Sequence, residues 1–127
     1  MKSIFICFVL AIFLVGPSMA GEVGVEDFQV NTTEDLIDLC TAPPEEPLAS
    51  QAIHFCHGYL VGAYHYYAAS VAGPNGVSLV CPPEPRPSRN DTIARFVAWV
   101  KDHPQYWNEL PVETEFRFLT EIWPCER

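Results

Sequence analysis

Residues 33–56 read TEDLIDLCTAPPEEPLASQAIHFC and contain two of the five cysteines of the chain. The start of this stretch predicts a short helix ending at Cys40, because threonine can cap it and its acidic first turn suits the positive end of the helix dipole. The prolines that follow break the helical pattern. A second helix is expected from about Pro47, so that Cys56 lies near its start. The stretch therefore predicts two helices joined by a short proline loop.

The rest of the chain continues this helical pattern. The second helix should run from about Pro47 to Ser70, where small and apolar residues recur at helical spacing before a glycine-rich turn. A capping-box pattern at Ser88 opens a third helix, which stops near His103 because the following proline disfavours helical backbone there. Pro111 begins a fourth helix at a position that tolerates proline. We therefore expect an all-α fold, a compact domain of about four helices stapled by disulfides, with no credible pair of strands.

The same patterns predict how these segments pack. Residues 21–31 should form a frayed lead-in. Gly58 and Gly62 lie four residues apart on the second helix. We expect them to let a neighbouring helix of the same chain approach closely, although this spacing would also suit a dimer interface. The fourth helix should bury a stripe of four residues at helical spacing: Val112, Phe116, Leu119 and Trp123.

Residues 1–20 have the features of a secretory signal peptide. Lys2 precedes an apolar run from Ile4 to Val15, and small residues suit cleavage near Ala20. A membrane-spanning helix would need about 20 apolar residues, so cleavage is the better interpretation. We expect a single exported helical domain, residues 21–127, without a membrane anchor after cleavage.

The charge of the chain restricts its partners. Without the signal peptide, six basic and sixteen acidic side chains would remain, a net charge of −10. A surface this acidic disfavours nucleic acid and anionic lipid headgroups, and it speeds the encounter with a basic partner. The same acidity could equally serve only to keep a small exported protein in solution.

Four cysteines remain after the predicted cleavage: Cys40, Cys56, Cys81 and Cys125. An even number of cysteines in a short exported chain is typical of a disulfide framework formed in an oxidising compartment. Four cysteines permit three pairings, and the chain-entropy model hardly separates them.

The sequence carries no pattern typical of catalysis or of a metal or cofactor site. His54 and His57 lie three residues apart on the second helix. A stable zinc site usually needs three or four ligands, and His65 is too far along the helix to join the other two. Cys56 and His57 point in different directions on a helix, which disfavours a nucleophile and its base. We expect no enzyme, no metal and no cofactor.

One surface segment is a candidate for binding a partner. Residues 102–110 read DHPQYWNEL between the third and fourth helices and offer Tyr106 and Trp107 beside Glu109. Aromatic side chains on a loop held by two helices are typical binding anchors. The alternative is that Trp107 folds inward and covers the core.

The chain resembles the Rap/Tai family of type VI secretion immunity proteins. The resemblance spans nearly the whole of residues 21–127 and rests on an ordered set of short motifs behind a signal peptide. These are DLIDLC (35–40), CHGYLVG (56–62), CPP (81–83), FVAWV (96–100) leading to His103-Pro104, and WPC (123–125).

The resemblance implies a small helical periplasmic protein, often dimeric, that binds and blocks a peptidoglycan amidase effector. Such an inhibitor needs no chemistry of its own. Together with the geometry of helix pairs, the resemblance favours the pairings Cys40–Cys56 and Cys81–Cys125. The alternative function is a periplasmic stress or chaperone-like helical protein without a dedicated toxin partner, because small acidic helical proteins can open when carboxylates are protonated.

Overall fold

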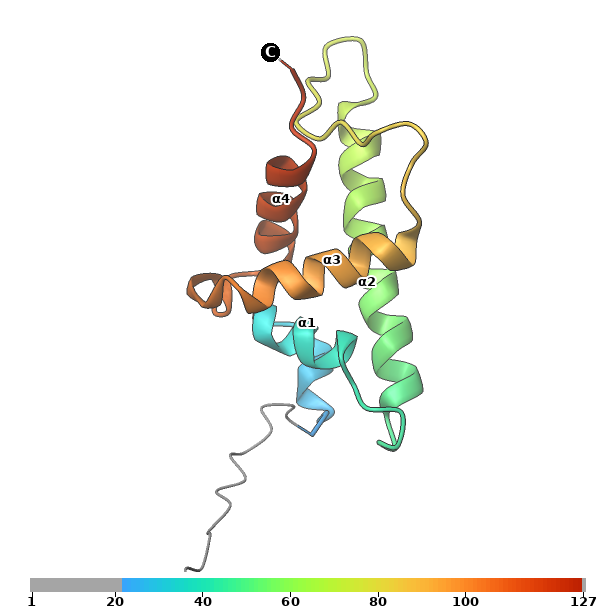
Figure 1. The fold of residues 1–127 in the computed structure, drawn as a ribbon, viewed down its shortest axis with the longest axis vertical. Helices are drawn as coiled ribbons and strands as arrows, with labels where there is room; N and C mark the ends of the chain where they lie inside the picture. The colour runs from blue at the N-terminus through green and yellow to red at the C-terminus, as the bar shows by residue number, and fades with distance from the viewer. Residues whose placement is uncertain (1–21, 127) are drawn as a thin grey trace, which may run out of the picture.

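The computed structural model describes residues 22–126 and contains four α-helices, as the sequence predicted (Figure 1). The predicted signal peptide, residues 1–20, lies outside the described residues. Within residues 22–126 the strand-like pairing is confined to an isolated bridge between Val80 and Pro124, so the all-α expectation is confirmed. The elements are η1 (Glu26–Gln29), α1 (Thr33–Cys40), α2 (Ala49–Val71), α3 (Arg89–Lys101), η2 (Pro104–Tyr106) and α4 (Pro111–Ile122), where η marks a 3-10 helix.

The longest element, α2, defines the long axis of the domain (Figure 1). α4 runs beside its C-terminal half, while α3 crosses it and α1 lies below α3 in this view. Each of the four α-helices contacts the other three, so they share one core. No helix within residues 22–126 combines the length and the apolar character needed to cross a membrane.

The core lies where the four α-helices meet. At its centre the rings of Phe96 and Phe118 meet edge to face, with centroids 5.6 Å apart. This geometry is the one that aromatic pairs prefer, because the positive ring edge faces the negative ring face. The buried residues include Leu36 and Leu39 of α1, Ala52 and Cys56 of α2, Phe96 and Val100 of α3, and Phe118 and Leu119 of α4.

Side chains cap α1 and α3 at the positions that the sequence indicated. The Thr32 hydroxyl accepts the N–H of Asp35 at 3.2 Å, and the Asp35 carboxylate accepts the N–H of Thr32 at 3.0 Å. The Ser88 hydroxyl accepts the N–H of Asp91 at 3.1 Å. These bonds satisfy N–H groups that a helix leaves unpaired in its first turn, so they fix where α1 and α3 begin.

The structure confirms both favoured disulfides. Cys40–Cys56 joins the end of α1 to the first half of α2 across a sequence separation of 16. Cys81–Cys125 joins the loop before α3 to the segment after α4 across a separation of 44. In the chain-entropy model the two bridges contribute roughly 3 and 4 kcal/mol respectively. One bridge thus cross-links α1 to α2, and the other cross-links the loop before α3 to the C-terminal segment.

The expectation of a frayed lead-in is wrong for the described part of that segment. Residues Glu26–Gln29 form η1, and Val23 is buried. The Phe28 ring meets the Phe55 ring of α2 edge to face at 5.5 Å, and the N–H of Val23 donates to the Glu46 carboxylate at 2.9 Å. The segment is ordered because it packs on α1 and α2, a tertiary effect that its local sequence does not reveal.

α4 buries a face different from the predicted stripe. Leu119 is buried as expected, but Val112 is exposed and Phe116 and Trp123 are half-buried. The predicted stripe is wrong because it was drawn from apolar residues alone. Two of the buried residues of α4, Thr114 and Glu115, are polar. The buried residues of α4 are Pro111, Thr114, Glu115, Phe118 and Leu119.

The expectation of a close helix contact at Gly58 and Gly62 is also wrong. A side chain added at either glycine would meet no atom within 4 Å among the described residues, and both glycines are exposed. They belong to a face of α2 that no other element of residues 22–126 covers. Its exposed residues are Gly58, Gly62, Tyr66 and Ala69.

Candidate functional site

The segment 102–110 connects α3 to α4 and is anchored to the start of α1. The N–H of Thr33 donates to the Glu109 carbonyl at 2.8 Å, and the N–H of Glu34 donates to the Trp107 carbonyl at 3.0 Å. The Thr33 hydroxyl also donates to the Glu109 carbonyl at 3.1 Å. The first N–H groups of a helix lack partners within the helix, and here the loop supplies them. The loop is therefore held in a fixed position against α1.

Tyr106 belongs to a group of three nearly parallel rings at the end of α3. Trp99 and His103 stack with centroids 4.0 Å apart and 23° between their planes. The Tyr106 ring lies 5.6 Å from Trp99 at 10° and 5.9 Å from His103 at 13°. All three side chains are half-buried, so the group presents part of its area to solvent. We call these three residues the aromatic stack.

An ion pair borders the aromatic stack on the side of α4. Arg117 donates to the Glu109 carboxylate through two nitrogens, at 2.8 and 3.1 Å. Its guanidinium lies 5.0 Å from the centroid of the Tyr106 ring. The hydrogen bond to Glu109 and its negative charge raise the pKa of Arg117 above its ordinary value. Glu109 is thus oriented by a bidentate partner, which is the geometrically specific form of this pair.

Trp107 has a different role from its neighbours. Its indole N–H donates to the Val100 carbonyl at 3.1 Å, and its ring packs against the core. The side chain therefore covers the core, as in the alternative considered from the sequence. Tyr106 and Glu109 remain at the surface, while Trp107 fastens the loop that carries them.

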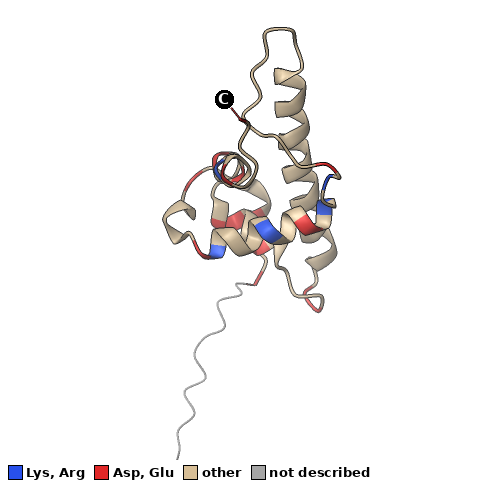
Figure 2. Ribbon diagram, turned by 45° about the horizontal axis from the view of Figure 1, so that its top comes forward, with Lys and Arg blue, Asp and Glu red and all other residues tan. Residues whose placement is uncertain are grey.

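A cluster of acidic residues surrounds Asp38 of α1. Burial, together with the nearby negative charges, raises the pKa of Asp38 from 3.8 to about 6. Figure 2 shows acidic residues gathered on α1 and basic residues along α3. The cluster consists of Asp27, Glu34, Asp35, Asp38 and Glu46.

Part of this surface is predictable from the sequence. Tyr106 and Glu109 were identified, but Trp99 and His103 were not. Their spacing of four residues on one helix is a signal that could have found them, because residues i and i+4 are neighbours on a helix. Arg117 could not be found in this way, since its pairing with Glu109 depends on how α4 packs.

The histidines do not come together. The His54 ring nitrogen Nδ1 lies 2.6 Å from the Ser50 carbonyl, and His103 stacks on Trp99. In the part of the chain that the structure describes, no group of three or more His, Cys, Asp or Glu side chains is placed to hold a metal ion.

Comparison with known proteins gives one match. A model of the family of Rap1a immunity proteins matches residues 32–125, which include all four α-helices and both disulfides. The match confirms the resemblance drawn from the short motifs. No curated protein and no solved structure matches the chain significantly.

Proposed function

Because the chain belongs to the family of Rap1a immunity proteins, we propose that it binds and inhibits a peptidoglycan-cleaving amidase effector of type VI secretion. The observation that carries this proposal is the family match over residues 32–125. Inhibition by such a protein works by occlusion, in which a complementary surface fills the groove of the enzyme. No chemistry by the inhibitor is required.

We propose the periplasm as the place where this inhibition occurs. Two disulfides in a chain of 127 residues favour an oxidising compartment. The secretory signal predicted in residues 1–20 supports the same location. An amidase effector acts on the cell wall, so its inhibitor has to be present on that side of the inner membrane.

The surface that we propose for the amidase combines the aromatic stack with the acidic cluster. Tyr106 supplies a rigid aromatic group, and Glu109 supplies an oriented carboxylate beside it. Glu34 bonds to the same loop through its backbone N–H, so that the acidic helix α1 is joined to the loop that carries Tyr106. Such a surface would attract a basic groove and speed the encounter. Trp107 contributes by holding the loop.

We also propose that two copies of the chain associate through the uncovered face of α2. Residues 49–71 contain no Asp, Glu, Lys or Arg. Two mature chains, each with six basic and sixteen acidic side chains and a net charge of −10, repel one another elsewhere, so a face without charge is where they can approach. Sedimentation velocity of the mature chain tests this. Gly62→Glu should shift a dimer to monomer, while Ala94→Glu on the exposed side of α3 should leave it unchanged.

The test of the proposed function is the identity of the partner. The tagged mature chain is exported to the periplasm of the source strain, and co-purifying proteins are identified by mass spectrometry. We expect a cell-wall hydrolase in stoichiometric amount. Recovery of the chain alone, with candidate hydrolases present and unbound, would contradict the proposal. Suppression of client aggregation near pH 3 would then favour the chaperone-like alternative.

A further inference from the structure

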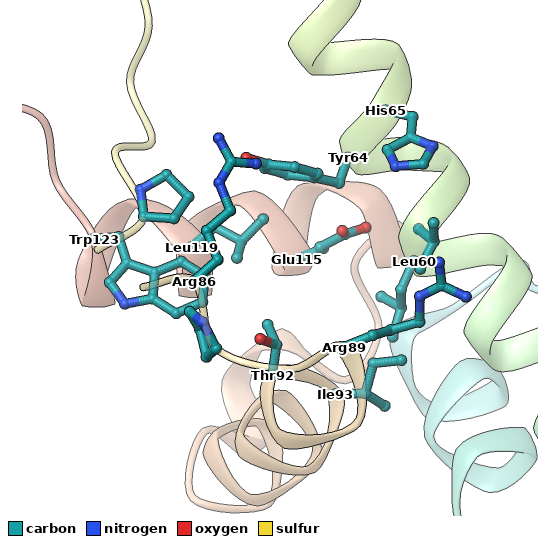
Figure 3. Close-up of a pocket in the computed structure, with 13 residues that line it drawn as sticks. Leu60, Tyr64, His65, Arg86, Arg89, Thr92, Ile93, Glu115, Leu119 and Trp123 are labelled. Atoms are coloured by element: carbon teal, nitrogen blue, oxygen red, sulfur yellow. The ribbon is translucent and has the colours of Figure 1, made fainter. Parts of the chain in front are cut away.

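A cavity of about 310 Å³, whose lining includes none of the residues of the aromatic stack, lies between α2, α3 and α4 (Figure 3). Its walls come from α2, α3, α4 and the proline-rich loop between Cys81 and Ser88. Apolar side chains form most of the lining, among them Leu60, Leu119 and Trp123. A volume near 300 Å³ is at the lower end of the range for small-molecule sites. The cavity therefore suits a small ligand.

A buried carboxyl group points into this cavity. Glu115 is only 4% exposed, and its Oε2 atom has no hydrogen-bond partner among the described residues. Figure 3 shows the carboxyl group directed into the space between α2 and α4. Burial raises the pKa of Glu115 from 4.5 to about 8. Glu115 therefore holds its proton at neutral pH, and a positively charged donor that entered the cavity would favour the ionised carboxylate and pair with it.

The mouth of the cavity carries the opposite charge. Arg86 and Arg89 line it, and both are exposed. Arg86 makes an exposed ion pair with Glu84 at 3.4 Å, which contributes little. Arg89 makes no ion pair with any residue between 22 and 126. The other titratable side chains in the lining are Tyr64 and His65.

The cavity is thus acidic at its base and basic at its mouth. A ligand with only a positive charge would meet repulsion from the two arginines. A ligand with only a negative charge could pair with the arginines, but it would leave Glu115 uncharged and without a positive partner. A small molecule that carries an ammonium group and a carboxylate a few bonds apart satisfies both ends.

We propose that this cavity binds a free amino acid, with its ammonium group on the Glu115 carboxylate and its carboxylate on the Arg89 guanidinium. The side chain of the amino acid lies against Leu60, Leu119 and Trp123. Arg86 adds positive charge at the mouth without being the principal partner, because it shares its charge with Glu84. This site is separate from the surface proposed for the amidase and does not depend on that proposal.

The test measures how free amino acids change the melting temperature of the mature, disulfide-bonded chain. The standard L-amino acids are screened singly at millimolar concentration, and any that raises the melting temperature is titrated by calorimetry. A ligand that binds only the folded chain raises this temperature by mass action. We expect at least one amino acid to bind, and its N-acetyl and amide derivatives to bind at least about tenfold more weakly.

Matched variants connect the binding to the cavity. Glu115→Gln should weaken it about tenfold or more, while Glu113→Gln, an exposed carboxylate on the same helix, should not change it. Arg89→Gln should weaken it more than Arg86→Gln, with Lys101→Gln as the control on α3. Circular dichroism of each variant checks that it is folded before binding is measured.

Three results would overturn the proposal. One is that no amino acid shifts the melting temperature of the wild-type chain. Another is that binding survives unchanged in Glu115→Gln or in the N-acetyl derivative. The third is that free amino acids have no effect while Glu115→Gln weakens amidase binding, which would make the cavity part of the amidase surface.

Discussion

Thr33 and Thr114 share a buried hydrogen bond of 2.8 Å between their hydroxyl groups, 81 residues apart in sequence. Both side chains are inaccessible to solvent. The Thr33 hydroxyl also donates to the Glu109 carbonyl at 3.1 Å. This pair joins α1 to α4 and holds the loop that carries Tyr106 against both helices.

Replacing Thr33 should therefore destabilise the fold more than replacing Thr114. Thr33→Val keeps the volume but leaves the Thr114 hydroxyl and a Glu109 lone pair without this partner, at a cost of about 1–3 kcal/mol. Thr114→Val leaves Thr33 its bond to Glu109 and should cost about 1 kcal/mol. Urea unfolding of both variants measures the difference. Equal losses would show that the bond to Glu109 contributes nothing.

Glu115 should make the domain less stable as the pH rises from acid to neutral. The pKa of its carboxyl is raised from 4.5 to about 8. Below pH 4.5 both the folded and the unfolded chain hold this proton. Between the two values only the unfolded chain releases it, so the free energy of unfolding falls as the pH rises, by on the order of 3 kcal/mol up to pH 7.

Glu115→Gln isolates this contribution. The difference in unfolding free energy between the variant and the wild type should grow in favour of the variant from pH 4.5 to 8 and then level off. The pKa of Asp38 is also raised, but its contribution to the unfolding free energy is the same in the variant and the wild type, so it cancels when the two are subtracted. A difference that stays constant over this range would contradict the raised pKa of Glu115.

The two disulfides should be reduced in order. Cys81 is exposed and Cys125 is half-buried, whereas Cys56 is inaccessible to solvent. A thiolate reductant has to reach a sulfur atom, so it should open Cys81–Cys125 first. Limited reduction, alkylation and peptide mass spectrometry identify the labelled cysteines. Labelling of Cys40 and Cys56 at the same rate would show that the core opens as readily as the loop.

Gly58→Ala and Gly62→Ala should each stabilise the domain. Both glycines lie inside α2 with open space around them, so a methyl group meets no clash. Alanine in an exposed helix interior is favoured over glycine by about 1 kcal/mol. Thermal unfolding under conditions where the chain is monomeric measures the gain. Gly76→Ala is the contrasting variant, because an added Cβ would strike the Val71 carbonyl and should destabilise the turn after α2.

The helices were predictable because they depend on local signals, whereas the disulfide pairing was predictable from helix-pair geometry and the family resemblance. α1 was predicted from Thr33 to Cys40 and has those bounds in the structure. The buried face of α4 was not predictable from the sequence. Thr114 is buried where it bonds to Thr33, a residue 81 positions away, and Glu115 is buried where α4 packs near α2 and α3. Tyr106 and Glu109 could be identified as surface residues. Their anchoring to α1 required the three-dimensional arrangement.

Tyr106→Ala should weaken amidase binding by about 2 kcal/mol or more, if the aromatic stack is the contact that we propose. The loop should stay folded, since Trp107 and the bonds to α1 remain. Val77→Ala is the control, because Val77 is an apolar side chain that is 75% exposed and belongs to neither proposed surface. Surface plasmon resonance with the purified amidase compares the two variants. Equal affinity for both would remove the aromatic stack from the contact surface.

Inhibition of the co-purified hydrolase tests the central claim most directly. The release of soluble fragments from purified peptidoglycan is followed while the mature chain is added to the hydrolase. We predict that activity falls in proportion to the added chain and is lost near one chain per enzyme. Full activity in the presence of excess folded chain would contradict the assignment of this protein as an inhibitor of a cell-wall amidase.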